Sequence, residues 1–316
     1  MAGFRFEVPI GVAAGGRPAA ACEISPEGVV AAATPAAGQP PVYAAETLVP
    51  LSVMPGLLES NLADPVRVSA AIRAALAQVQ PRVKSVTVVV PDAAVRVFVL
   101  DFDTMPARQD ETLPVLRFRL RKSVPFDVEQ AGLSYQVLSE GSSRLGTQWK
   151  VLAAIMPGPV LSEYESVVRQ AGYEPGVVLP VSLAVLAAIS ATDSQEAVLL
   201  VNLSSHTLTT SIVAGNDVLL YRTVELPRDL QGFQSEVQRA IAVSAAFYED
   251  RLQVRPHRLL YSGVLPAREF AELVDDLELA VGEVVPRSAY GDVVGMATAM
   301  GQASVAGVTG ALAGTN

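Results

Sequence analysis

The sequence has 316 residues, of which 50% are hydrophobic and 17% charged, with a formal net charge of −9. A chain of this length accommodates about two domains, and its acidic balance argues against a nucleic-acid partner, because phosphate backbones repel it. The single cysteine, Cys22, excludes an internal disulfide. Together with the two histidines it provides too few ligands for an ordinary zinc site.

A mean hydropathy of +0.36 requires a search for membrane spans. The most span-like stretch, residues 293–313, carries no charge, but small and polar residues dominate it, so we expect a helix buried inside a domain. The N-terminal sequence MAGFRFEVP lacks the apolar centre of a signal peptide. These two observations lead us to expect a cytoplasmic protein.

Two hairpin patterns organise the chain. Residues 9–25 contain two apolar runs joined at Gly15-Gly16, which is typical of a β-hairpin with a tight turn. Residues 197–226 contain three further runs, VLLVNLSS, TLTTSIVAG and DVLLYRTVEL. We therefore predict two halves that each open with an antiparallel meander.

The segments between and after these meanders alternate between strand and helix patterns. Asp64 suits an N-cap and Pro65 a first helical position, so a helix is predicted to start there and to stop at Pro81. Strands are predicted at 85–90 and 95–100, as partners of each other. Further helices are predicted at 108–122, 159–171, 180–189, 230–251 and 266–277, and further strands at 28–36, 133–140, 148–157, 258–261 and 281–285. This alternation predicts an α/β protein with mixed sheets.

Several segments together resemble one family. They are the hairpin IGVAAGGRPAAACEIS, the helix–VPFD–strand passage LRFRLRKSVPFDVEQAGLSYQVL, the hairpin VLLVNLSSHTLTTSIV, the helix EVQRAIAVSAAFYE and LLYSG. They are similar to PilM-type proteins of type IV pilus assembly, relatives of the cell-division actin homologue FtsA. The resemblance implies an actin-like ATPase fold, with two RNase H-like lobes of mixed sheets and a small inserted α+β subdomain. It implies a first lobe at 1–80 and 156–190, the insert at 81–155 and a second lobe at 191–316.

The function that this resemblance implies is a cytoplasmic scaffold, peripheral at the inner membrane. Such a scaffold binds the short cytoplasmic tail of a PilN-like bitopic protein and links it to pilus motor ATPases, and self-association is a further expectation. The alternatives are the actin-like component of a type II secretion platform, which normally continues into a membrane span, and a sugar kinase of the same superfamily.

The resemblance also implies a nucleotide cleft with altered phosphate loops. The family pattern D-x-G-x-x-x-x-K places Ala13 and Ala20 at the charged positions and leaves Gly15, beside Gly16, in the turn. The second loop, D-x-G, reads Asn202-Leu203-Ser204 and continues into Ser205. The third reads Ser262-Gly263-Val264, and Glu236 begins a match to the family's E-x-x-R. Losing charged partners of a phosphate costs ~2–5 kcal/mol each, so the sequence predicts a pseudo-ATPase without ATP or magnesium; residual binding through backbone N–H groups is the alternative.

Partner binding is expected near a basic run. The run consists of Arg117, Arg119, Arg121 and Lys122. It is either a solvated helix face or a contact surface for acidic groups, which would belong to lipid headgroups or to the tail of a partner protein. Phe126, after a proline, is either a core residue or a peptide anchor.

A phosphatase is a more distant alternative. The segment VFVLDFDT places Asp101 and Asp103 in a pattern that resembles the first motif of haloacid-dehalogenase-type phosphatases. That chemistry also needs a downstream lysine and an acidic pair that follows a strand. The one matching acidic pair, Asp275-Asp276, falls in a helical pattern. We therefore expect that Asp101 and Asp103 only end a strand.

Overall fold

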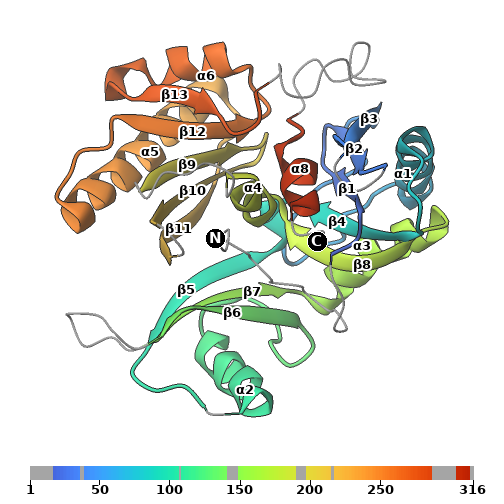
Figure 1. Ribbon diagram of the computed structural model, residues 1–316, viewed down its shortest axis with the longest axis horizontal. Coiled ribbons are helices and arrows are strands. Elements are labelled where there is room, and N and C mark those ends of the chain that lie inside the picture. The colour runs from blue at the N-terminus through green and yellow to red at the C-terminus, as the bar shows by residue number, and fades with distance from the viewer. Residues whose placement is uncertain are drawn as a thin grey trace.

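The computed structural model describes residues 17–35, 39–106, 108–140, 149–189, 197–214, 217–286 and 304–313. These residues form three sheets, which Figure 1 shows at the right, at the upper left and at the bottom. The first sheet has the order β3-β2-β1-β4-β8, the second β11-β10-β9-β12-β13 and the third β5-β7-β6. The Gly15-Gly16 turn lies outside the described residues, and the domain boundaries remain predictions.

The first sheet contains the strands β1 (Ala20–Ile24), β2 (Gly28–Ala33), β3 (Val42–Thr47), β4 (Ser85–Val90) and β8 (Glu174–Pro180). Strand β1 pairs antiparallel with β2 and parallel with β4. Successive residues of β1 enter different hydrophobic clusters: Cys22 and Ile24 share one, and Ala21 belongs to another. The sheet is therefore covered on both faces, as the alternation of side chains along a strand requires.

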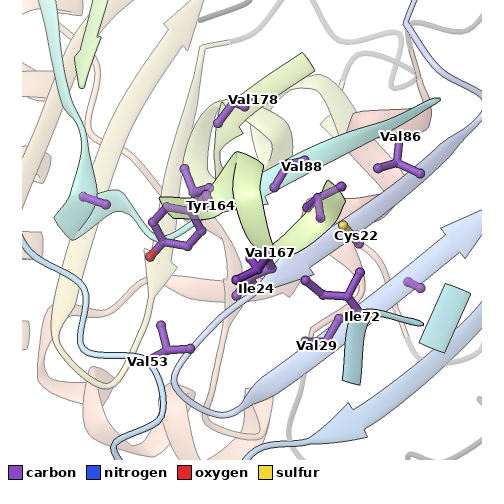
Figure 2. Packing of buried hydrophobic residues seen from close by; sticks show 14 of the residues in the cluster. Cys22, Ile24, Val29, Val53, Ile72, Val86, Val88, Tyr164, Val167 and Val178 are labelled. Carbon is purple, nitrogen blue, oxygen red and sulfur yellow. The ribbon is translucent and has the colours of Figure 1, made fainter. Parts of the chain in front are cut away.

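The helices α1 (Pro65–Val79) and α3 (Gly158–Gln170) cover one face of the first sheet. The Asp64 side chain accepts a hydrogen bond from the backbone N–H of Arg67 at 3.0 Å, which confirms the predicted helix start. Ile72 of α1 and Tyr164 of α3 pack with Cys22 and Val88 of the sheet (Figure 2).

The opposite face of the first sheet is covered by α4 (Val181–Ile189) and α8 (Ala306–Leu312). An added Cβ at Gly310 would lie 1.8 Å from the carbonyl oxygen of Ala184, so the two helices approach closely because a glycine stands there. The described part of the stretch 293–313 is thus a buried helix, as predicted. No helix among the described residues is both long enough and apolar enough to span a bilayer.

The second sheet forms the other lobe, with strands β9 (Val198–Leu203), β10 (Thr207–Ala214), β11 (Asp217–Glu225), β12 (Arg258–Gly263) and β13 (Ala280–Glu283). Strands β9 to β11 form the predicted meander. Helices α5 (Leu230–Leu252) and α6 (Ala267–Leu273) pack on this sheet through a common core, and a short helix, η2 (Asp275–Leu277), follows α6.

The third sheet is the inserted subdomain, with strands β5 (Arg96–Phe102), β6 (Gly132–Glu140) and β7 (Trp149–Met156), and with helix α2 (Gln109–Leu120) packed on it. The predicted pairing of 85–90 with 95–100 is wrong. Strand β4 instead pairs with β1 and β8, and β5 pairs with β7. A strand that is apolar along its whole length is best buried inside a parallel sheet, and the short helix η1 (Asp92–Ala94) then leads the chain away from that sheet.

Candidate functional site

A pocket of about 410 Å³ lies between the two lobes, and we call it the interlobe pocket. Its lining comes from the end of β1 with the following turn (23–27), the ends of β9 (202–204) and β12 (262–264), and the region of α8, to which Ser304 and Gly307 contribute. In open α/β sheets, ligands bind beyond the carboxyl ends of the strands. The interlobe pocket occupies that position, which makes it the candidate site.

Four residues predicted from the sequence line the interlobe pocket: Asn202, Ser204, Ser262 and Gly263. Parallel pairing of β9 with β12 sets Asn202 beside Ser262. The Ser204 hydroxyl accepts a hydrogen bond from the backbone N–H of Thr207 at 2.9 Å and so closes the β9–β10 turn.

Close packing explains the glycine at the end of β12. An added Cβ at Gly263 would lie 2.6 Å from the carbonyl oxygen of Leu203, a distance that real Cβ atoms do not reach. The neighbouring Ser262 hydroxyl shares a hydrogen bond of 3.0 Å with that of Ser304. The strand end of the second lobe is thereby joined to the segment that leads into α8.

Two predicted cleft residues do not line the interlobe pocket. The Ser205 hydroxyl is exposed and shares a hydrogen bond with Nδ1 of His206 at 2.7 Å. Glu236 forms an ion pair of 2.7 Å with Arg239 one helical turn away, and this pairing lowers the pKa of Glu236. The two charged residues of the E-x-x-R match therefore pair with each other.

A buried carboxylate lies at the junction of the lobes and the insert. Oδ1 of Asp92 accepts hydrogen bonds from the backbone N–H and the hydroxyl of Ser182, at 3.1 and 2.7 Å. Oδ2 accepts from the Thr209 hydroxyl at 2.7 Å and from the Asn202 amide at 3.3 Å. Burial raises the pKa of Asp92 above its usual range, against the opposing effect of these hydrogen bonds. The amide nitrogen of Asn202 is thus engaged within the protein.

Glu23, which the sequence reasoning missed, lies at the end of β1 and lines the interlobe pocket. Its Oε2 atom is buried and has no hydrogen-bond partner among the described residues. Burial, with the nearby charges of Glu27 and Asp92, raises the pKa of Glu23 to about 8. The available signal was an acidic residue inside the apolar run AACEI.

The lining combines acidic, apolar and uncharged polar residues. Glu23 and Glu27 are its charged residues, and its described part includes no lysine or arginine. No group of three or more histidine, cysteine or acidic side chains suited to a metal ion occurs in the described part of the chain. The residues of this pocket suit a hydrogen-bonding or cationic ligand better than a phosphate.

The predicted partner-binding residues lie in the insert. Arg117 donates a hydrogen bond of 3.1 Å to the carbonyl oxygen of Ala131, and Arg121 forms an exposed ion pair of 3.1 Å with Glu129. Lys122 is exposed. Phe126 is half-buried against the core of the insert.

Phe118 of α2 was not predicted as a contact residue, although 77% of it is exposed. It lies between Arg117 and Arg119, and the guanidinium of Arg119 lies 5.3 Å from the ring centroid of Phe102. Asp101 and Asp103 are exposed at the end of β5, outside the lining of the interlobe pocket.

No family model and no curated protein matches the chain. Among solved structures, a chain of a "PilM-PilN type IV pilus biogenesis complex" is similar to it, with a TM-score of 0.73, 18% identity and coverage of 94% of this chain and 98% of that one. A Bacteroides thetaiotaomicron "protein with actin-like ATPase fold and unknown function" is also similar, with a TM-score of 0.50, 10% identity and coverage of 86% and 91%. The chain thus has the actin-like ATPase fold, and the resemblance to PilM-type proteins is confirmed at the level of the fold.

Proposed function

We propose that the chain is a non-catalytic scaffold of a type IV pilus, or of a related secretion platform, and that it binds a short segment of a bitopic, PilN-like membrane protein. The observation that carries the proposal is the similarity, over nearly the full length of both chains, to a chain of the PilM–PilN complex. On this proposal the chain lies at the cytoplasmic face of the inner membrane and is held there through its partner. Contacts with motor ATPases and self-association are part of the same proposal.

The non-catalytic part of the proposal rests on the interlobe pocket. A triphosphate would face Glu23 and Glu27 without a described lysine or arginine in the lining. The amide that stands in place of the family's second aspartate donates to Asp92. Because buried phosphates need cationic partners or magnesium, we expect titration calorimetry with Mg-ATP to give no measurable binding. Micromolar affinity would contradict the pseudo-ATPase proposal.

The partner-binding part of the proposal is assigned to the exposed side of α2 and the turn after it. There an exposed aromatic ring, Phe118, lies near the cations Arg121 and Lys122. Aromatic and arginine residues are common anchors of protein interfaces. An acidic segment would complement the two cations of this surface, and an apolar residue within that segment would pack on the exposed ring.

A pull-down against solubilised inner-membrane proteins tests the scaffold. Wild-type chain should enrich a small bitopic protein with a short cytoplasmic tail, and the double variant R121E/K122E should recover less of it. The matched control is R268E, which reverses an exposed arginine of α6 that pairs with Glu272. Recovery of soluble metabolic enzymes alone would contradict the scaffold, and equal recovery by all variants would contradict the assignment to α2.

A further inference from the structure

The interlobe pocket contains the carboxyl group of Glu23, and the described charges that act on this group are all acidic. Strands β2 and β4 and helices α4 and α8, which surround the end of β1, carry no charged residue. The charges that act on Glu23 are Glu27, on the β1–β2 turn, and Asp92, on η1, and both are acidic. Each described charge near this carboxyl group therefore favours a cation.

Glu23 also lacks the internal partner that a buried carboxyl group normally has. Its Oε2 atom lies 2.1 Å from the position that a Cβ at Gly307 would occupy, so α8 packs directly over it. The oxygen accepts no hydrogen bond from the described residues. By contrast, Asp92 accepts four hydrogen bonds. The described residues therefore leave Glu23 without the hydrogen bonds that stabilise Asp92.

The remaining walls of the interlobe pocket are mostly apolar. Their apolar residues include Ile24, Val30, Val181 and Val264, and their uncharged polar residues are Ser25, Asn202, Ser204, Ser262 and Ser304. A volume of about 410 Å³ lies within the range for small-molecule sites, which combine apolar walls with a few convergent polar groups. A ligand that matches these walls carries one positive charge and an aliphatic body.

We propose that the interlobe pocket binds a protonated primary amine on an unbranched aliphatic chain, with Glu23 and Glu27 holding the ammonium group and the apolar walls holding the chain. The source is either a free small amine or a lysine side chain of another protein, since the two share this chemistry. This inference does not depend on the proposed scaffold role.

Binding is coupled to release of a proton. Because the pKa of Glu23 is raised to about 8, its carboxyl group is mostly neutral at pH 7. An ammonium ion favours the carboxylate, so the Glu23 proton passes to solvent as the amine binds. An alkyl amine keeps its own charge, since its pKa of about 10.4 lies far above this range. Affinity should therefore rise about tenfold between pH 6 and pH 7 and level off above pH 8.

Titration calorimetry with n-hexylammonium chloride tests this in the full chain. Repeating it at pH 7 in two buffers of different ionisation enthalpy measures the protons released, and about one per site is expected. E23Q replaces a neutral carboxyl group by a neutral amide of similar shape; it should bind at least about tenfold more weakly at pH 8 and should release no proton. E27Q should weaken binding but keep the proton release. The matched control is E59Q, at an exposed position outside the lining.

Two further probes identify the source and the selectivity. A neutral capped pentapeptide with one central lysine reports the protein source: binding by the peptide points to a lysine side chain, and binding by hexylammonium alone points to a free amine. Sodium hexanoate has the same apolar body with the opposite charge, and it should not bind. Equal binding of hexanoate, unchanged proton release in E23Q, or no binding of either amine probe would overturn the proposal. The pull-down measures partner recovery independently of amine binding. A failure of the amine proposal would therefore not contradict the scaffold proposal.

Discussion

The raised pKa of Glu23 predicts an unusual dependence of stability on pH. In the unfolded chain this carboxyl group titrates near 4.5, and in the native protein burial moves its pKa to about 8. Between these values the native state holds a proton that the unfolded state has lost. Stability must therefore fall as the pH rises, by about 1.4 kcal/mol per pH unit for one group. The contribution is fully present below about pH 4.5 and is lost above about pH 8.

The substitution Glu23→Gln isolates this effect. Glutamine keeps the shape of the protonated side chain but does not titrate, so the variant should match the wild type near pH 5. At about pH 8.5 it should be the more stable of the two, by at most about 5 kcal/mol, which is the full difference between the two pKa values. Titrating groups that do not interact with Glu23 contribute equally to both proteins and cancel in the comparison, whereas Glu27 and Asp92, whose charges act on Glu23, are part of the measured difference.

Urea denaturation at a series of pH values measures both curves, and a constant slope m shows that the denatured states are comparable. E59Q, at an exposed position, should follow the wild type at every pH. If the curves of wild type and E23Q stay parallel from pH 5 to pH 8.5, then Glu23 is not protonated in the native state, and the reasoning from its burial is wrong.

Substitutions at three further positions test the packing of the protein, each by urea denaturation. Asp92→Ala leaves the buried donors of Ser182, Thr209 and Asn202 without their acceptor, and we expect it to lower the free energy of unfolding by about 3–5 kcal/mol; a loss below about 1 kcal/mol would mean that water replaces the carboxylate. Gly263→Ala should cost about 1–3 kcal/mol because its Cβ meets the Leu203 carbonyl, and an unchanged midpoint would show that β12 shifts freely. Ile72→Ala should cost about 2–5 kcal/mol and Ile72→Val about 0.5–1.5, in proportion to the cavity left in a fully buried site; equal losses would argue against a cavity effect.

Local signals account for what the sequence predicted correctly. The Asp64 side chain accepts a hydrogen bond from a free backbone N–H of the first helical turn, and Pro65 has the φ angle that a helix needs. The start of α1 could therefore be predicted without knowledge of the fold. The apolar run at 85–90 predicts a strand in the same way, because its side chains suit a sheet buried on both faces. Asn202 and Ser262 were found because the second and third loop patterns of the family resemblance fall on them, each near the end of an apolar strand.

Elements that depend on distant partners could not be placed in this way. Strand β8 contains Pro175, Gly176 and Pro180, and it forms because β4 offers an adjacent parallel edge. Helix α2, by contrast, was predicted at 108–122, and it runs through Pro114 with its buried residues Leu116 and Leu120 packed on the insert. Packing against a sheet outweighs such local preferences.

The sequence alone determined most of the helices and strands, because capping and apolar periodicity act within a few residues, but it did not predict β3 or β8. Only the tertiary structure decided which of those strands are neighbours and that Glu23, Asp92 and the α8 region meet between the lobes. Residues so far apart in the chain come together only when both sheets bury their faces, and that burial also sets the charge each of them carries.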